Sequence, residues 1–84
     1  MANTLQLELV TPEKTVVDKA VDSVQIPGAD GYMGILPGHA ALLSELGTGA
    51  LSYVIGGKTE TLKISGGFVE IRDNHVRVLA DKVE

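Results

Sequence analysis

The stretch FVEIRDNHVRVLA, residues 68–80, contains two short runs of alternating side chains separated by Asp73–Asn74. In VEIR, and again in HVRV, apolar and polar residues follow one another in strict alternation. Such alternation is typical of a strand with one buried face. Asp and Asn both tolerate the positive φ angles that a two-residue turn requires. The stretch therefore predicts a β-hairpin.

The same pattern continues outward from this hairpin. TLQLELV, residues 4–10, alternates cleanly, and shorter strand-like runs occupy residues 15–18 and 22–26. A second hairpin is indicated by ALSYVI and KTETLKI, because these two runs flank Gly56–Gly57. Gly66–Gly67 falls between two strand-like runs, where it favours a bulge or a bend between sheets.

Helical patterning is almost absent from the chain. Only HAALLSEL, residues 39–46, could form one helical turn or two. Many short strands separated by turn signals predict an all-β protein, either an antiparallel sandwich of two sheets or a flattened barrel. We expect residues 1–84 to form a single domain whose core is built from Val, Ile and Leu.

The composition argues against several classes of protein. The chain has no cysteine, which excludes disulfides and thiolate zinc sites, and its net charge of −4 argues against a nucleic-acid partner. No apolar run approaches the roughly 20 residues that cross a bilayer. The first 46 residues carry six acidic and two basic side chains, which indicates either a solvated acidic face or a surface matched to a basic partner.

The stretch GADGYMGILPGHAALL, residues 28–43, is both too apolar for a simple loop and too rich in glycine for a simple strand. Glycine recurs at every third position from Gly28 to Gly34, which suits a sharp turn that another chain can approach closely. Tyr32 and Met33 could then contact a partner. Alternatively, the loop folds back and buries Met33 and Ile35. We expect the chain to return to a strand from Ile35 to Leu43.

The sequence gives little support for an enzyme. No pair of histidines has metal-ligand spacing, and the glycines do not form a phosphate loop, so no metal and no cofactor is expected. His75 follows a tight turn and is expected at an exposed strand position. For His39 we consider a hydrogen bond that anchors the loop, a contact with a partner and, as a distant third possibility, a catalytic base.

Three separated motifs point to a known family. They are GILPGHAALL at residues 34–43, SGGFVEI at residues 65–71 and VRVLAD at residues 76–81. Together they resemble the epsilon subunit of F-type ATP synthases, and the resemblance runs in order over the whole chain. It implies a ten-stranded β-sandwich of two sheets, in agreement with the strand pattern.

The resemblance also implies a function. Epsilon is a non-catalytic subunit of the central stalk, and it couples the membrane c ring to the gamma subunit during ATP synthesis driven by ion translocation. The expected partners are therefore gamma and the c ring, and indirectly the catalytic head. The expected location is the cytoplasmic face of the bacterial inner membrane, as a peripheral part of the complex without direct membrane insertion.

The resemblance assigns contact residues by their positions in its motifs. Those expected to touch the c ring are Gly28, Asp30, Gly31, Tyr32 and Met33. Those expected to touch gamma are His39, Leu42 and Leu43. Two positions depart from the family pattern: Tyr32 stands where an acidic or polar residue is usual, and Ala41 replaces the usual proline.

Most bacterial members continue past the VLAD motif into two helices that inhibit ATP hydrolysis. The sequence ends at Glu84, so it is either a piece of a longer protein or a short natural form, and we expect these residues alone not to exert that inhibition. Two other classes of function remain open: a free-standing β-sandwich that binds a protein or ligand, and a small enzyme whose site is assembled from distant strands.

Overall fold

The computed structural model describes residues 4–84, so the expected start of the domain at Met1 lies outside the described residues. All regular structure in residues 4–84 is strand, and no helix there could cross a membrane. The strands are β1 (Leu5–Val10), β2 (Thr15–Val21), β3 (Ser23–Gly28), β4 (Gly31–Ile35), β5 (Leu42–Glu45), β6 (Thr48–Ile55), β7 (Lys58–Arg72) and β8 (His75–Val83). The prediction of an all-β protein is confirmed.

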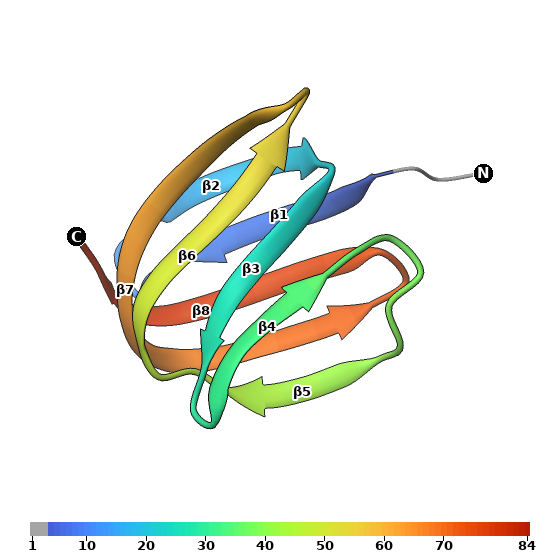
Figure 1. Ribbon diagram of the computed structural model, residues 1–84. Helices are drawn as coiled ribbons and strands as arrows, with labels where there is room; N and C mark the ends of the chain where they lie inside the picture. The colour runs from blue at the N-terminus through green and yellow to red at the C-terminus, as the bar shows by residue number, and fades with distance from the viewer. Residues whose placement is uncertain (1–3) are drawn as a thin grey trace.

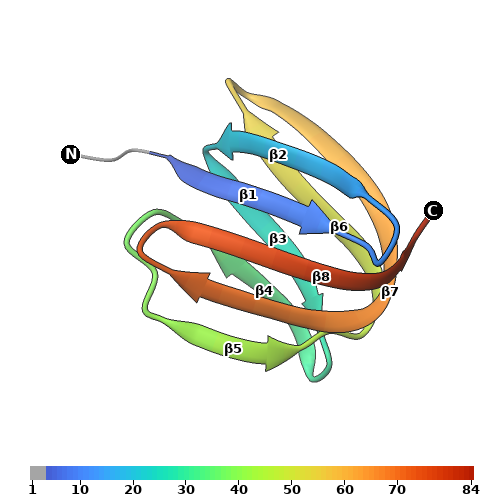
Figure 2. The same ribbon diagram turned by 180° about the vertical axis from the view of Figure 1, so that it is seen from behind.

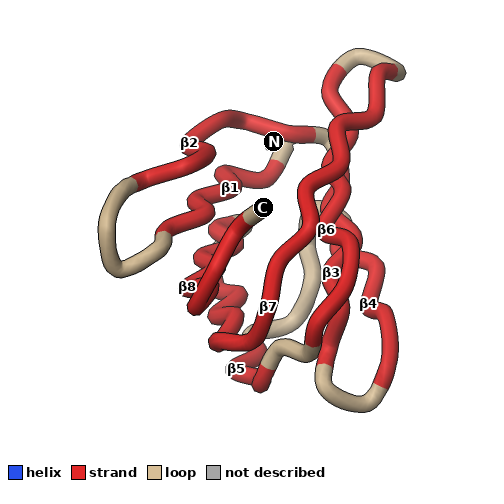
Figure 3. Tube along the Cα trace, turned by 90° about the vertical axis from the view of Figure 1, so that its left-hand side faces the viewer, coloured by secondary structure: helices blue, strands red, loops and turns tan. Residues whose placement is uncertain are grey.

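The strands form two facing layers joined by β7 (Figure 1). One layer contains β2, β1, β8, the second half of β7 and β5, and the other contains the first half of β7, β6, β3 and β4. Figure 2 shows the first layer from outside, and Figure 3 shows how β7 passes from one layer to the other. The β-sandwich is therefore one continuous sheet that folds over at β7 to form both layers.

The bend in β7 lies at Gly66–Gly67, as the sequence predicts. Residues 58–65 pair with β6, and most of residues 64–72 pair with β8. At the crossing point Gly66 has φ 62°, in the left-handed region, and Gly67 has φ 112°, a value that only glycine adopts easily. One continuous strand thus replaces two expected strands.

Both predicted hairpins are present. Asp73 and Asn74 have φ 51° and 61° in the turn between β7 and β8. Gly56 and Gly57 have φ 56° and 82° between β6 and β7. Positive φ at both central residues matches the right-handed twist of the flanking strands.

Three details differ from the expectation. The structure has eight strands rather than ten, and β1 pairs with β8 in parallel, so the sheet is not purely antiparallel. β1 and β8 come from opposite ends of the chain, so no tight turn forces them to be antiparallel. The prediction of a strand from Ile35 to Leu43 is also wrong, because β4 ends at Ile35 and β5 starts at Leu42. No helical turn forms between these two strands.

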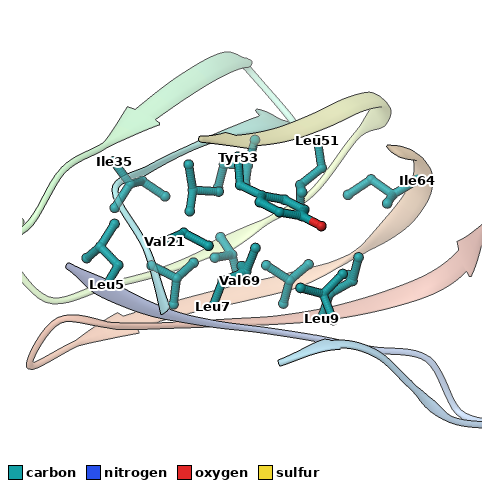
Figure 4. Close-up of a cluster of buried hydrophobic side chains, with 14 of the residues drawn as sticks. Leu5, Leu7, Leu9, Val21, Ile35, Leu51, Tyr53, Ile64 and Val69 are labelled. Atoms are coloured by element: carbon teal, nitrogen blue, oxygen red, sulfur yellow. The ribbon is translucent and has the colours of Figure 1, made fainter. Parts of the chain in front are cut away.

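The core between the layers is aliphatic, as the composition predicts. Leu5, Leu7 and Leu9 point inward from β1, and the buried cluster that they join includes Ile35, Leu51 and Ile64 from the other layer (Figure 4). Among the described residues, no polar or charged side chain is buried. Burial of an aliphatic side chain of this size stabilises the fold by about 1.5–3 kcal/mol.

Candidate functional site

The glycine-rich stretch forms a hairpin with a short, exposed tip. Gly28 on β3 pairs with Gly31 on β4, so that only Ala29 and Asp30 lie outside the strands. Asp30 is exposed at the turn, and the tip is at the lower end of the molecule in Figure 1. The expected c-ring residues Gly28, Asp30, Gly31, Tyr32 and Met33 are thus brought together in one hairpin.

The β3 side of this tip is tied to the chain segment between β5 and β6. Ala29 N–H donates to the Glu45 carbonyl oxygen at 3.1 Å, and Gly47 N–H donates to the Pro27 carbonyl oxygen at 2.8 Å. Gly28 forms a bridge with Leu46 between these two bonds. The β3 side of the tip is therefore held where the two layers meet.

Tyr32 and Met33 leave the hairpin on opposite faces. Met33 is half-buried and packs against the core, and Ile35 is fully buried, so the alternative that this stretch folds back onto the core is confirmed for both residues. Tyr32 is 56% exposed on the outer face. The phenol oxygen of Tyr32 accepts the Ala50 N–H of β6 at 3.1 Å.

His39 lies in the loop between β4 and β5. The His39 N–H donates to the Leu36 carbonyl oxygen at 3.1 Å, and His39 Nδ1 lies 2.7 Å from the Ala40 carbonyl oxygen. These contacts fit the loop-anchoring role considered for this residue. Because the loop follows the far end of β4 from Gly31, the structure separates His39 from the hairpin tip.

Asn74 connects this loop to two other segments. Asn74 Oδ1 accepts the Gly38 N–H at 2.7 Å, and the Asn74 carbonyl oxygen accepts the Gln6 N–H at 2.8 Å. The side-chain acceptor and the positive φ of 61° together explain why asparagine suits this turn position.

We expect Asn74→Gly to lower the free energy of unfolding by about 1 kcal/mol, because glycine accepts the φ angle but loses the bond to Gly38. Asn74→Ala should lower the free energy of unfolding by about 1–2 kcal/mol more than Asn74→Gly does, because alanine is also strained at this positive φ. Urea denaturation of both variants measures the difference. Equal stability of Asn74→Gly and the unmodified chain would show that the bond to Gly38 contributes nothing.

An exposed apolar patch lies on the outer face of the layer that contains β5, β7 and β8. It consists of Leu43, Phe68 and Leu79, which are 71%, 52% and 45% exposed. Phe68 lies directly opposite Leu79, and Leu43 lies opposite Glu70, which places Leu43 diagonally from Phe68 within aromatic reach. We call these three residues the outer apolar patch.

Phe68 and Leu79 were not among the expected contact residues. A signal for them exists in the alternation, because Val69 and Ile71 point inward and Phe68 must then point outward. Of the expected gamma residues, Leu43 belongs to the patch, whereas Leu42 is half-buried and packs against the core. The patch adjoins the hairpin tip, because Phe68 pairs with Glu45 and Glu45 accepts the Ala29 N–H.

A charged hollow lies on the same outer face. It has a volume of about 330 Å³ and is lined by Glu70, Arg72, Asp73, His75 and Arg77. His75 is exposed as predicted, and its Nε2 lies 3.4 Å from Glu8 Oε1, which also lies 3.6 Å from Arg77 Nε. In residues 4–84 no group of three His, Asp or Glu side chains is placed to hold a metal ion.

Comparison with known proteins identifies relatives over the whole length of the chain. Residues 4–84 match the family model described as "ATP synthase, Delta/Epsilon chain, beta-sandwich domain". All 84 residues align with the ATP synthase epsilon chains of Solibacter usitatus, at 51% identity, and of Carboxydothermus hydrogenoformans, at 49% identity. The chain spans 63% of the length of each of these two relatives.

Solved structures give the same fold. A chain in the structure of Euglena gracilis mitochondrial ATP synthase, described as OSCP/F1/c-ring, matches all of this chain with a TM-score of 0.93 at 26% identity. The match covers 54% of the Euglena chain. A chain of the Tetrahymena thermophila mitochondrial ATP synthase central stalk and c-ring matches 95% of this chain, over 65% of its own length, with a TM-score of 0.81 at 17% identity.

Proposed function

Since the chain belongs to the family of ATP synthase delta/epsilon β-sandwich domains, we propose that it is a non-catalytic rotor subunit that couples the c ring to gamma. It works at the cytoplasmic face of the bacterial inner membrane as a peripheral part of the complex. The observation that carries this proposal is the match of the entire chain, at about half identity, to ATP synthase epsilon chains.

The geometry supports two separate contacts. The hairpin tip, residues 28–33, presents its backbone and the exposed Asp30 side chain at one end of the sandwich, which suits the polar loops of a c ring. The outer apolar patch occupies the adjoining side, and its desolvation would favour a protein partner. We assign the tip to the c ring and the patch, with His39 in the loop that precedes β5, to gamma, whereas Leu42 packs inward against the core.

Co-purification tests this assignment. The full chain is mixed with the cognate gamma subunit, with and without the purified c ring, and the bound fraction is measured. We expect a stable complex with gamma alone and a tighter one when the ring is present. If the chain binds gamma neither with nor without the c ring, the proposed function is overturned.

Asp30 provides a test of the tip. We expect Asp30→Asn to weaken binding to the ring by a factor of up to about five at low salt, as for an exposed charge pair. The difference should shrink at high salt, where such pairs are screened. Glu13→Gln, an exposed acid in the turn between β1 and β2, is the matched control and should bind normally. Equal losses in both variants would contradict a specific role for Asp30.

A further inference from the structure

Tyr32 connects three strands. Its strand, β4, pairs only with β3 among the described residues, so the other edge of β4 is open. Tyr32 lies opposite Pro27 of β3 and reaches past it to the Ala50 N–H of β6. In residues 4–84 this is the one hydrogen bond that links β4 to a strand other than β3.

The hydroxyl of Tyr32 completes a ladder that the backbone leaves open. β3 pairs with β6 only from Ser23 to Gln25. Beyond that point Pro27 has no N–H, and its carbonyl oxygen accepts the Gly47 N–H. The phenol oxygen therefore takes the place of a main-chain acceptor for Ala50.

Gly49 leaves room for the phenol group of Tyr32. A Cβ atom at position 49 would lie 2.6 Å from the Tyr32 hydroxyl oxygen and 3.1 Å from Pro27 Cβ. Any side chain at this position would therefore displace the tyrosine or the proline. The hydrogen bond from Ala50 to Tyr32 therefore requires glycine at position 49.

We propose that Tyr32 is a positioning residue, which fixes β4 to β6 and thereby sets the direction in which the hairpin tip presents Asp30. The proposal rests on the proposed function, in which the tip docks on the c ring. Its physical reason is that an edge strand with one partner is easily twisted, and a second attachment restricts the twist. The alternative is that Tyr32 itself touches the ring.

Two variants release the same attachment from opposite sides. Tyr32→Phe removes the hydroxyl group. Gly49→Ala keeps the tyrosine but displaces its phenol side chain from the Ala50 N–H. Assembled with gamma, each should bind the c ring roughly two- to tenfold more weakly, as expected for one lost hydrogen bond. The double variant should be no weaker than the single variants, because both remove one interaction. Binding to gamma should not change.

A double-mutant comparison with Asp30 distinguishes a positioning role of Tyr32 from a purely structural role and from direct contact with the c ring. If Tyr32 orients the tip, Asp30→Asn should have a smaller effect in the Tyr32→Phe background than in the unmodified chain. Additive effects would overturn the positioning role, as would normal ring binding by Tyr32→Phe. This comparison also stands if Gly49→Ala fails to fold.

Two measurements complete the test. Hydrogen exchange of the Ala50 amide should be faster in Tyr32→Phe, because its acceptor is gone. Tyr53→Phe, which removes the hydroxyl of the other tyrosine of the chain, should leave ring binding unchanged. Absence of ring binding by the unmodified chain would overturn the c-ring part of the proposed function, whereas ring binding that is insensitive to Tyr32→Phe would overturn the positioning role alone.

Discussion

Leu43→Lys is expected to weaken binding to the gamma subunit by at least about thirtyfold, the loss typical of a central interface residue. Leu43 has the largest exposed fraction, 71%, of the exposed large apolar side chains. A lysine there would place a charge within the outer apolar patch and would need to be desolvated on binding. Binding of the folded variant to purified gamma measures the effect.

The fold should tolerate this change. Leu43 faces Glu70 across the β5–β7 pair, so the new lysine gains an opposite charge on the neighbouring strand. Phe68→Lys repeats the test at a second patch position, where Glu45 lies opposite. Thr61→Lys adds the same charge at an exposed position on β7 within the other layer and should bind gamma normally.

Leu42 shows why stability must be measured together with binding. It is half-buried and packs against the core, so a charge there is expected to destabilise the domain rather than remove a contact. Leu43→Lys should unfold at the same urea concentration as the unmodified chain. If Leu43→Lys and Phe68→Lys are both folded and bind gamma with unchanged affinity, the outer apolar patch is not the gamma surface.

Alternation in the sequence predicted much of this fold. The inward residues of β1, β7 and β8 follow directly from period-two patterning, and the turns at Gly56–Gly57 and Asp73–Asn74 follow from their φ preferences. The parallel pairing of β1 with β8 could not be predicted this way, because alternation identifies a buried face but not the neighbouring strand. The loop from Leu36 to Ala41 was mistaken for a strand although Pro37–Gly38 is a turn signal.

The candidate site was predicted less completely than the fold. Motif positions grouped the residues of the hairpin tip, which the structure confirms as one hairpin. The attachment of Tyr32 to Ala50 depends on how β4, β3 and β6 cross in space, and nothing local to either residue indicates it. Leu42 and Leu43 are adjacent, and only the register with β7 establishes which of them faces outward.

The second large effect is expected at the bend of β7, where Gly67→Ala should lower the free energy of unfolding by more than about 3 kcal/mol. A Cβ atom at this position would collide with the Leu79 carbonyl oxygen, and that backbone atom is held in place by the β7–β8 pairing. The φ of 112° is also strained for alanine. Since small domains are stable by only about 5–15 kcal/mol, the loss is a large part of the total.

Gly34→Ala is the matched control for this prediction. No atom lies within 4 Å of a Cβ atom placed at Gly34, so alanine there should be neutral or should stabilise the chain by up to about 1 kcal/mol. Urea denaturation of both variants gives the comparison. Because the bend carries β7 from one layer to the other, a destabilised Gly67→Ala should also lose binding to gamma and the c ring together. A Gly67→Ala variant as stable as Gly34→Ala would mean that β7 and β8 do not approach this closely.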